Sequence, residues 1–318
     1  MKKPLIILTG PTAVGKTKLS ISLAQAVNGA IISADSMQVY RHMDIGSAKI
    51  RPEEMCGVPH YLIDVLDPSE EFHVVKFVEL AHEAMEKIYA AGQIPIVTGG
   101  TGFYIQALLK EVDFTESHGE LPIRKQLEEK AATEEGAAEL YRELSEVDPA
   151  SAETIHPNNV KRVIRALEYY HETGQKISEH NEEQKQKESP YCSAYFVLND
   201  ERSILYDRID RRVDQMICDG LVDEVFRLKE MGYTRDLVSM QGLGYKEILE
   251  YLDGECSLED AVYTLKRDTR HFAKRQLTWF RRESEVTWID KGRFDYNEEK
   301  ILEYMIRELG EKEIYEKQ

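Results

Sequence analysis

The sequence predicts an α/β fold, in which a parallel β-sheet is flanked by helices and one segment forms an all-helical insertion. Short, nearly all-apolar runs rich in β-branched residues recur along the chain, as expected of strands buried on both faces. Segments with helical periodicity separate these runs, and such alternation is typical of a parallel sheet with right-handed crossovers. A length of 318 residues allows a large core and an additional domain.

The predicted strands are residues 5–8, 30–34, 94–98, 194–198 and 286–289. Helices are predicted between them, at 16–27 and 74–91 among others, and several more follow the last central strand. The longest, 258–282, follows Ser257, which is a good N-cap residue with Asp260 three positions further on.

The segment 115–189 contains no run that resembles a buried strand. Helical patterns cover 122–145 and 159–172, the second ending before Gly174, and we expect the polar stretch 179–189 to be a flexible return. The segment carries 17 acidic and 10 basic residues, a net charge of −7. We therefore predict a core formed by 1–114 and 190–318 and a helical insertion formed by 115–189.

The composition restricts the partners of the protein. The 41 basic and 58 acidic residues give a net charge of −17, which disfavours indiscriminate binding to nucleic acid or anionic membranes but allows a local basic cleft. The four cysteines lie far apart without a CxxC pair, which argues against a zinc site and fits a reducing compartment. No apolar run approaches the roughly 18 residues of a membrane span. We expect a cytoplasmic protein that has no membrane partner and, without a coiled-coil pattern, is a monomer with no obligate protein partner.

A phosphate-binding loop follows the first predicted strand. Residues 10–17 match GxxxxGK[ST] between a strand and a helix, the context that the motif requires, so we predict a P-loop NTPase-like sheet. Backbone N–H groups of such a loop surround an anion, and the helix N-terminus adds partial positive charge. Lys16 supplies a full charge, and the Thr17 hydroxyl can bind Mg²⁺. The predicted ligand is a di- or triphosphate group, bound by Gly10, Pro11, Thr12, Ala13, Val14, Gly15, Lys16 and Thr17.

The strand at 94–98 lacks the terminal Asp that helps to hold the metal in many ATPases and GTPases. It ends instead in a turn at 98–102 that contains Thr101 and suits a second contact to an anion. Asp35 lies at the end of the second strand. Because the carboxyl ends of parallel strands form the binding crevice, we expect Asp35, Thr101 and the loop 10–17 to converge. Asp35 then suits an outer-shell metal ligand or a general base, whereas capping of the next turn is the structural alternative.

The chain resembles the bacterial tRNA dimethylallyltransferases, which belong to the wider isopentenyltransferase group. A generic P-loop kinase would share only the first of the matching stretches. One departure is Tyr61, where the family pattern predicts a second His. The stretches, in the order of the family, are 10–17, 34–49 (ADSMQVYRHMDIGSAK), 58–64 (VPHYLID), 97–104 (VTGGTGFY), 158–168 (NNVKRVIRALE), 220–225 (GLVDEV), 241–248 (QGLGYKEI) and 273–281 (AKRQLTWFR).

The resemblance implies the transfer of a dimethylallyl group from dimethylallyl diphosphate to N6 of adenosine 37 in tRNA, with release of diphosphate and no ATP hydrolysis. The loop 10–17, with Lys16 and with Mg²⁺ on Thr17, would then stabilise the departing diphosphate. Thr101 would add a hydrogen bond, and Arg208 matches the family's diphosphate-binding arginine. Asp35 would remove a proton from N6, and Ser36 and Gln38 would hydrogen-bond the flipped base.

The implied macromolecular partner is the tRNA anticodon stem-loop. Residues 258–282 carry seven basic and three acidic side chains, and Lys161, Arg162 and Arg165 form a basic face on the helix at 159–172. The family's tRNA-contacting stretch corresponds to 159–163, and Arg124 and 241–247 are further candidates. The expected tRNA contacts are Asp35, Ser36, Met37, Gln38, Thr101, Arg124, Asn159, Val160, Lys161, Arg162 and Val163.

Three other functions share parts of this pattern. An adenylate isopentenyltransferase would use free AMP or ADP as the acceptor, although the insertion and its basic face favour a large acceptor. A nucleoside or metabolite kinase would transfer a phosphoryl group from ATP and would be stabilised more by ATP than by diphosphate. A non-catalytic P-loop RNA-binding module would not need Asp35.

Overall fold

The structure is a computed structural model that describes residues 2–112 and 122–315. Within these residues the strands form one sheet in the order β3-β2-β4-β1-β5-β6, in which every pair is parallel, so the predicted fold class is confirmed. The strands are β1 (Lys3–Thr9), β2 (Gly29–Ala34), β3 (His60–Tyr61), β4 (Ile94–Gly99), β5 (Tyr191–Asn199) and β6 (Val286–Asp290).

The described residues divide into two compact units, which we call the core unit (1–109 and 190–318) and the insertion (110–189). One expected boundary, 114/115, lies outside the residues that the structure describes, and the other was 189/190. The helices that begin in the core unit are α1 (Lys16–Val27), α2 (Val74–Ala90), α3 (Gly102–Lys110), α9 (Arg202–Cys218), α10 (Leu221–Glu230), α11 (Tyr245–Leu252), α12 (Leu258–Phe280) and α13 (Glu298–Glu311). Those of the insertion are α4 (Pro122–Lys130), α5 (Glu134–Val147), α6 (Pro149–Thr154), α7 (Val160–Thr173) and α8 (Ile177–Gln186).

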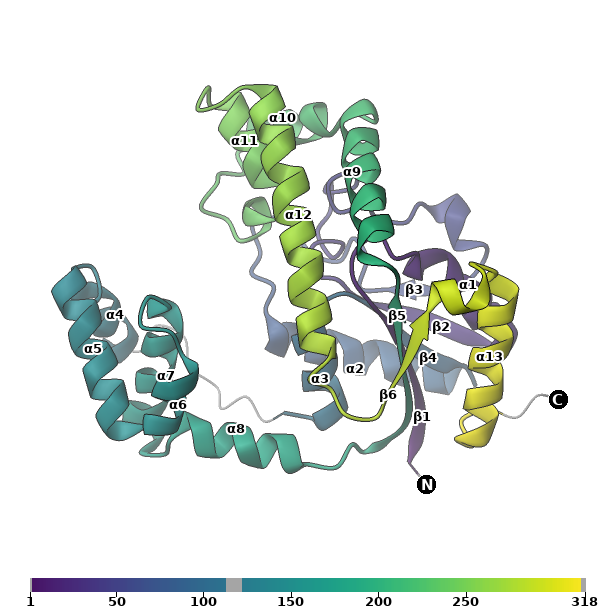
Figure 1. The fold of residues 1–318 in the computed structure, drawn as a ribbon, viewed down its shortest axis with the longest axis horizontal. Helices are drawn as coiled ribbons and strands as arrows, with labels where there is room; N and C mark the ends of the chain where they lie inside the picture. The colour runs from purple at the N-terminus through teal and green to yellow at the C-terminus, as the bar shows by residue number, and fades with distance from the viewer. Residues whose placement is uncertain (1, 113–121, 316–318) are drawn as a thin grey trace. The chain divides into compact units, whose positions relative to one another are not determined.

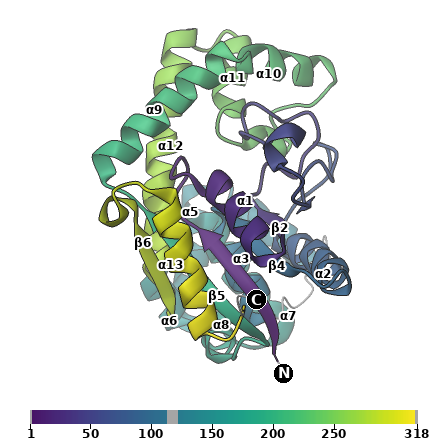
Figure 2. The same cartoon turned by 90° about the vertical axis from the view of Figure 1, so that its right-hand side faces the viewer.

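Helices cover both faces of the sheet, because its strands alternate apolar side chains between the two (Figures 1 and 2). Ile6 and Leu8 of β1 pack with α1 and α13, whereas Leu5 and Ile7 pack with α2 and α3. Beyond the carboxyl ends of the strands, α9 and α12 lie side by side (Figure 1). The insertion has its own core, to which α5 and α7 contribute Leu140, Leu144 and Leu167 among others.

Two predictions for the insertion are wrong. The helix expected at 122–145 is two helices, because Thr133 caps α5 with its hydroxyl, which accepts the N–H of Gly136 at 3.1 Å. The stretch 179–189, expected to be a flexible return, lies largely in α8. Asp148 anchors that helix, since its carboxylate accepts the N–H and the hydroxyl of Ser178 at 3.0 and 2.6 Å.

The core unit departs from the predicted elements in two places. The strand β3 was not predicted, because two residues leave no readable pattern, and it pairs with β2 through His60 and Ile31. The longest helix ends at Phe280 instead of 282. Within 2–112 and 122–315, no helix is long and apolar enough to cross a membrane.

Candidate active site

The sheet order brings the three predicted parts of the site together. β2, β4 and β1 are neighbours, so their carboxyl ends place Asp35, the turn with Thr101 and the phosphate loop side by side. A cavity of about 650 Å³ lies at this edge of the core unit. Its lining includes these predicted residues: Thr12, Ala13, Gly15, Lys16, Thr17, Asp35, Ser36, Met37, Gln38, Thr101 and Arg208. Gly10, Pro11 and Val14 of the loop do not line it, and Val14 is fully buried.

The phosphate loop is held in its turned conformation by its glycines. Gly15, which directly precedes α1, has φ +97°. This left-handed backbone conformation would strain any residue other than glycine. The Nζ atom of Lys16 donates to the carbonyl oxygens of Gly10 and Pro11, each at 2.9 Å. Burial and, to a smaller extent, the positive charge of Arg212 lower the pKa of Lys16 from 10.5 to about 7, although the negative charge of Asp35 opposes the shift.

Asp35 caps the turn that follows β2 and also lines the cavity. Its Oδ1 atom accepts the N–H groups of Met37 at 2.9 Å and Gln38 at 3.4 Å. Among the residues that the structure describes, Oδ2 has no hydrogen-bond donor. Asp35 therefore does cap the turn, as the structural alternative predicted, but only through Oδ1. This capping contact also fixes the orientation of Oδ2.

A cation that the sequence analysis missed lies next to Asp35 and Lys16. Arg212 lines the cavity, and burial lowers the pKa of its guanidinium while the negative charge of Asp35 raises it. Arg212 follows Arg208 by four residues on α9, so the two side chains share a helix face. The spacing of four residues could have revealed Arg212 in the sequence. It predicts that Arg212 lines the same cavity as Arg208, although only Arg208 was predicted.

Arg208 is oriented by a buried carboxylate. Its Nη1 atom donates to Oδ2 of Asp200 at 2.7 Å, and the Asp200 side chain is completely buried. The hydroxyl of Tyr296 donates to Oδ1 of the same carboxylate at 3.1 Å. Since a guanidinium has five N–H donors, Arg208 keeps others for a ligand in the cavity that it lines.

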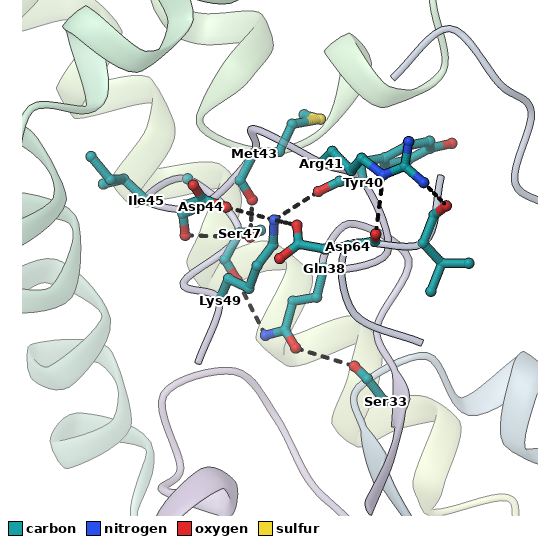
Figure 3. A network of polar contacts seen from close by, with 12 residues as sticks. Ser33, Gln38, Tyr40, Arg41, Met43, Asp44, Ile45, Ser47, Lys49 and Asp64 are labelled. Carbon is teal, nitrogen blue, oxygen red and sulfur yellow. Dashed lines mark hydrogen bonds and ion pairs between the residues drawn. The ribbon is translucent and has the colours of Figure 1, made fainter. Parts of the chain in front are cut away.

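Gln38 is tied to the loop that follows it (Figure 3). Its Oε1 atom accepts from the hydroxyl of Ser33 at 3.1 Å, and Nε2 donates to the carbonyls of Ser47 and Ala48, both at 3.4 Å. The same loop is fixed by Lys49, whose Nζ donates to Asp44 at 2.6 Å and Asp64 at 2.5 Å (Figure 3). Gln38 thus shapes the cavity wall as well as lining it.

Glu224 of α10 holds this loop from the other side. Its buried carboxylate accepts the N–H groups of Asp44, Ile45 and Gly46 at 3.0, 2.8 and 3.1 Å, and the hydroxyl of Tyr245 at 2.9 Å. A carboxylate that accepts several hydrogen bonds is a strong anchor, so Glu224 fixes the segment that contributes Gly46 and Ser47 to the cavity.

Apolar side chains complete the cavity wall. They come from β2, the segments after β2 and β3, the helices α9 and α12 and the turn before α11, which gives one cavity both an ionic and an apolar part. The apolar lining residues are Ile31, Met37, Ile50, Ile63, Ile209, Val213, Met216, Leu243, Leu265 and Phe272.

The residues predicted for the insertion differ in exposure. Lys161 and Arg162 are exposed at the start of α7, after Asn159, while Val163 is buried in the insertion's core, so only its backbone is available for contact. Val160 packs partly against that core. Arg124 and Arg165 both pair with Glu168, at 3.4 and 2.9 Å, so they already have a buried anionic partner.

The basic side chains of residues 258–282 are only partly free. Arg267 and Arg270 pair with Asp268 and Asp210. Lys274 and Arg281 are exposed, and neither forms an ion pair within the described residues.

The predicted magnesium site fits the donors present. No group of three or more His, Cys, Asp or Glu side chains within 2–112 and 122–315 is arranged to hold a metal ion. Mg²⁺ usually keeps several waters and binds through one or two protein oxygens together with substrate phosphates. Thr17, the last residue of the phosphate loop, lines the cavity and fits that mode of binding.

Comparisons with known proteins agree with this geometry. A family model described as IPP transferase matches residues 38–283, and one described as isopentenyl transferase matches residues 3–71. A tRNA dimethylallyltransferase of Lachnoclostridium phytofermentans is 65% identical over 313 residues, which cover 98% of this chain and 99% of the relative.

Solved structures of similar proteins match over most of the chain. The tRNA isopentenylpyrophosphate transferase of Bacillus halodurans is 46% identical, with a TM-score of 0.73 and 98% of each chain covered. A eukaryotic dimethylallyltransferase caught acting on tRNA is 35% identical, with a TM-score of 0.79, covering 91% of this chain and 74% of the other. The resemblance seen in the sequence is thereby confirmed, and the chain belongs to the IPP transferase family.

Proposed function

We propose that the protein transfers the dimethylallyl group of dimethylallyl diphosphate to N6 of adenosine 37 in tRNA. The bond between C1 of the donor and the bridging oxygen breaks, and the diphosphate leaves with the electron pair. A bond between C1 and N6 forms, and N6 loses a proton. The products are N6-(dimethylallyl)adenosine and diphosphate.

The observation that carries this proposal is the make-up of the cavity. A phosphate loop, three arginines (Arg208, Arg212 and Arg275), the carboxylate of Asp35 and an apolar wall line the same space of about 650 Å³. A prenyl diphosphate needs a cation cluster and an apolar surface next to each other, and this cavity offers both. The tRNA dimethylallyltransferase relative with 65% identity supports the same reaction.

The leaving group needs stabilisation of its developing negative charge. The N–H groups of 13–17, Lys16, Arg208 and Arg212 surround the part of the cavity that would hold the diphosphate. Mg²⁺, when bound to the Thr17 hydroxyl and the phosphate oxygens, would neutralise further charge on the leaving group. Thr101 adds a hydroxyl from the neighbouring turn.

Asp35 would accept the proton of N6. The lone pair of this amino group is delocalised into the purine ring, so removal of a proton as the bond forms assists the reaction. Oδ1 is committed to the N–H groups of Met37 and Gln38, and these bonds direct Oδ2 as the proton acceptor. Ser36 and Gln38 would contact the flipped base.

The tRNA would be bound outside this cavity by exposed cations. Lys161 and Arg162 of the insertion, Lys274 of α12 and Arg281 directly after α12 offer such cations despite the net charge of −17. Arg124 is paired with both Glu128 and Glu168, so it would contact RNA only through the N–H groups that these ion pairs leave free.

The test of this function is a product analysis. The protein is incubated with Mg²⁺, labelled dimethylallyl diphosphate and an unmodified tRNA, the RNA is digested, and the nucleosides are separated. We expect labelled N6-(dimethylallyl)adenosine from this tRNA and none from a matched transcript with guanosine at position 37. Label in free AMP but not in tRNA would instead identify an adenylate isopentenyltransferase, and ATP-dependent phosphorylation would identify a kinase.

A further inference from the structure

A buried glutamine connects the two loops that line the phosphate side of the cavity. Gln276 of α12 is 6% exposed. Its Oε1 atom accepts the N–H of Thr12 at 2.9 Å, and its Nε2 atom donates to the carbonyl oxygen of Gly100 at 3.0 Å. Thr12 belongs to the phosphate loop after β1, and Gly100 to the turn after β4. One side chain therefore joins two loops that are far apart in the sequence.

The two partners require an amide at this position. Thr12 presents a backbone donor and Gly100 a backbone acceptor, and an uncharged side chain that accepts and donates at once satisfies both. Gly100 is equally constrained, because a Cβ atom there would lie 2.0 Å from Nε2 of Gln276. The close approach of the amide thus needs glycine on one side and glutamine on the other.

The contacts of Gln276 add to a hydrogen bond that already joins β1 and β4. At the ends of β1 and β4, the Thr9 hydroxyl donates to the carbonyl of Gly99 at 2.6 Å. Gln276 repeats this connection beyond the strands, where the sheet no longer holds the loops together. Gly100 immediately precedes Thr101, and Thr12 immediately precedes the loop residues 13–17, so Gln276 acts next to the groups that would contact the diphosphate.

We propose that Gln276 is a positioning residue that holds the Thr101 hydroxyl in register with the phosphate loop, so that both act on the same diphosphate. This inference rests on the proposed function. Gln276 touches the backbones of the two loops and acts on the donor through them. A misplacement of about 1 Å at a reacting group can reduce turnover roughly a hundredfold, so the link matters for rate as well as for folding.

The first test replaces the amide with a side chain of similar length. Gln276→Met keeps most of the volume and removes both hydrogen bonds. We expect kcat to fall roughly tenfold to a hundredfold, with a smaller change in KM for tRNA, and inorganic diphosphate to bind several-fold more weakly by calorimetry. Gln106→Met is the matched control, because Gln106 is a half-buried glutamine of α3 whose amide contacts Glu283 and neither loop. Unchanged kcat and diphosphate affinity in folded Gln276→Met would overturn the inference.

The second test uses a variant that regains the missing donor in acid. In Gln276→Glu an ionised carboxylate still accepts from Thr12, but it has no proton for Gly100. When it is protonated it becomes a near isostere of glutamine, and burial favours that form. We therefore expect the activity of the variant relative to the wild type to rise as the pH falls toward about 6, whereas a packing role predicts a constant ratio. The titratable groups that line the cavity occur in both proteins, so the ratio removes the pH dependence that the two proteins share: Lys16, Asp35, His60, Arg208, Arg212, Lys246 and Arg275.

A double-mutant cycle separates this inference from the proposed function. If Gln276 acts through Thr101, Gln276→Met should weaken diphosphate binding much less in a Thr101→Ala background than in the wild type. Fully independent effects would contradict the inference. Because the cycle is measured with inorganic diphosphate, it gives an answer even if the wild-type protein fails to alkylate tRNA, a result that would reject the proposed function alone.

Discussion

The lowered pKa of Lys16 predicts that diphosphate binding depends on pH. Burial, together with the smaller effect of the Arg212 charge, brings this pKa to about 7. In the free protein Lys16 therefore loses its charge as the pH rises through about 7. An anionic ligand binds the charged form better, so it raises the pKa of Lys16 and draws a proton onto the side chain above that pH.

The size of the effect follows from the protonated fraction. With a pKa of about 7, half of the Lys16 side chains are charged at that pH. About 3% are charged near pH 8.5, so diphosphate affinity should fall about fifteenfold across this interval, or about 1.6 kcal/mol. Below about pH 6 the side chain is fully charged, and its contribution to the pH dependence disappears.

Arg212→Met provides the matched comparison. Removing this positive charge raises the pKa of Lys16, although burial still keeps it below 10.5. The loss of affinity should therefore begin at a higher pH in the variant, even though its absolute affinity is lower. Diphosphate itself titrates in this range, but it does so equally with both proteins, so the ratio of their affinities isolates the protein's contribution.

Calorimetry with inorganic diphosphate, in buffers of different ionisation enthalpy, measures both the affinity and the number of protons taken up. Above about pH 7 we expect binding to be accompanied by the uptake of more protons than diphosphate alone accounts for. In Arg212→Met this extra proton uptake should begin at a higher pH. Identical pH profiles for the two proteins would refute the coupling between Arg212 and Lys16. Affinity that does not decline above pH 7 would refute the lowered pKa.

Three other changes test the remaining parts of the site. Asp35→Asn should slow transfer to tRNA by ~10²–10⁴ while changing diphosphate affinity far less, and near-normal single-turnover rates would exclude the proposed base. Lys161→Ala with Arg162→Ala should reduce the slope of log affinity for tRNA against log salt by about 1.5, and an unaltered slope in filter-binding titrations would show that these cations do not contact phosphates. Glu224→Ala leaves buried N–H donors unpaired and should cost roughly 2–4 kcal/mol of unfolding free energy in urea, so an unchanged midpoint and slope would mean that the loop at 44–46 has other support.

The parts of the site that the sequence predicts are those with a local pattern and a topological rule. The loop 10–17 is recognisable because strand, glycines, lysine and helix follow one another without a gap. Asp35 and Thr101 needed one more step, the rule that the ends of parallel strands share an edge. The order β2-β4-β1 fulfils it, since each of these strands ends beside the next.

Some features were readable but were missed. Arg212 follows Arg208 at helical spacing, and Thr133 is a capping residue followed by two glutamates. The polar helix α8 is different, because its composition resembles a linker and its anchor, Asp148, lies about 30 residues upstream. Local propensity could not indicate this tertiary contact.

The contacts that fix the site geometry have no sequence period at all. Gln276, Gln38 and Glu224 each bind backbone groups of other segments, and the partners of Gln276 lie 264 and 176 residues away. Every loop has backbone N–H and carbonyl groups, so a residue of any type can be the partner in such a contact. The sequence therefore contains no complementary residue that would reveal the contact. A buried amide or carboxylate inside a recognised stretch is therefore visible in the sequence, but its role appears only when the fold shows which backbone it satisfies. This asymmetry explains why the groups proposed to touch the diphosphate could be predicted, while the residue that aligns them could not.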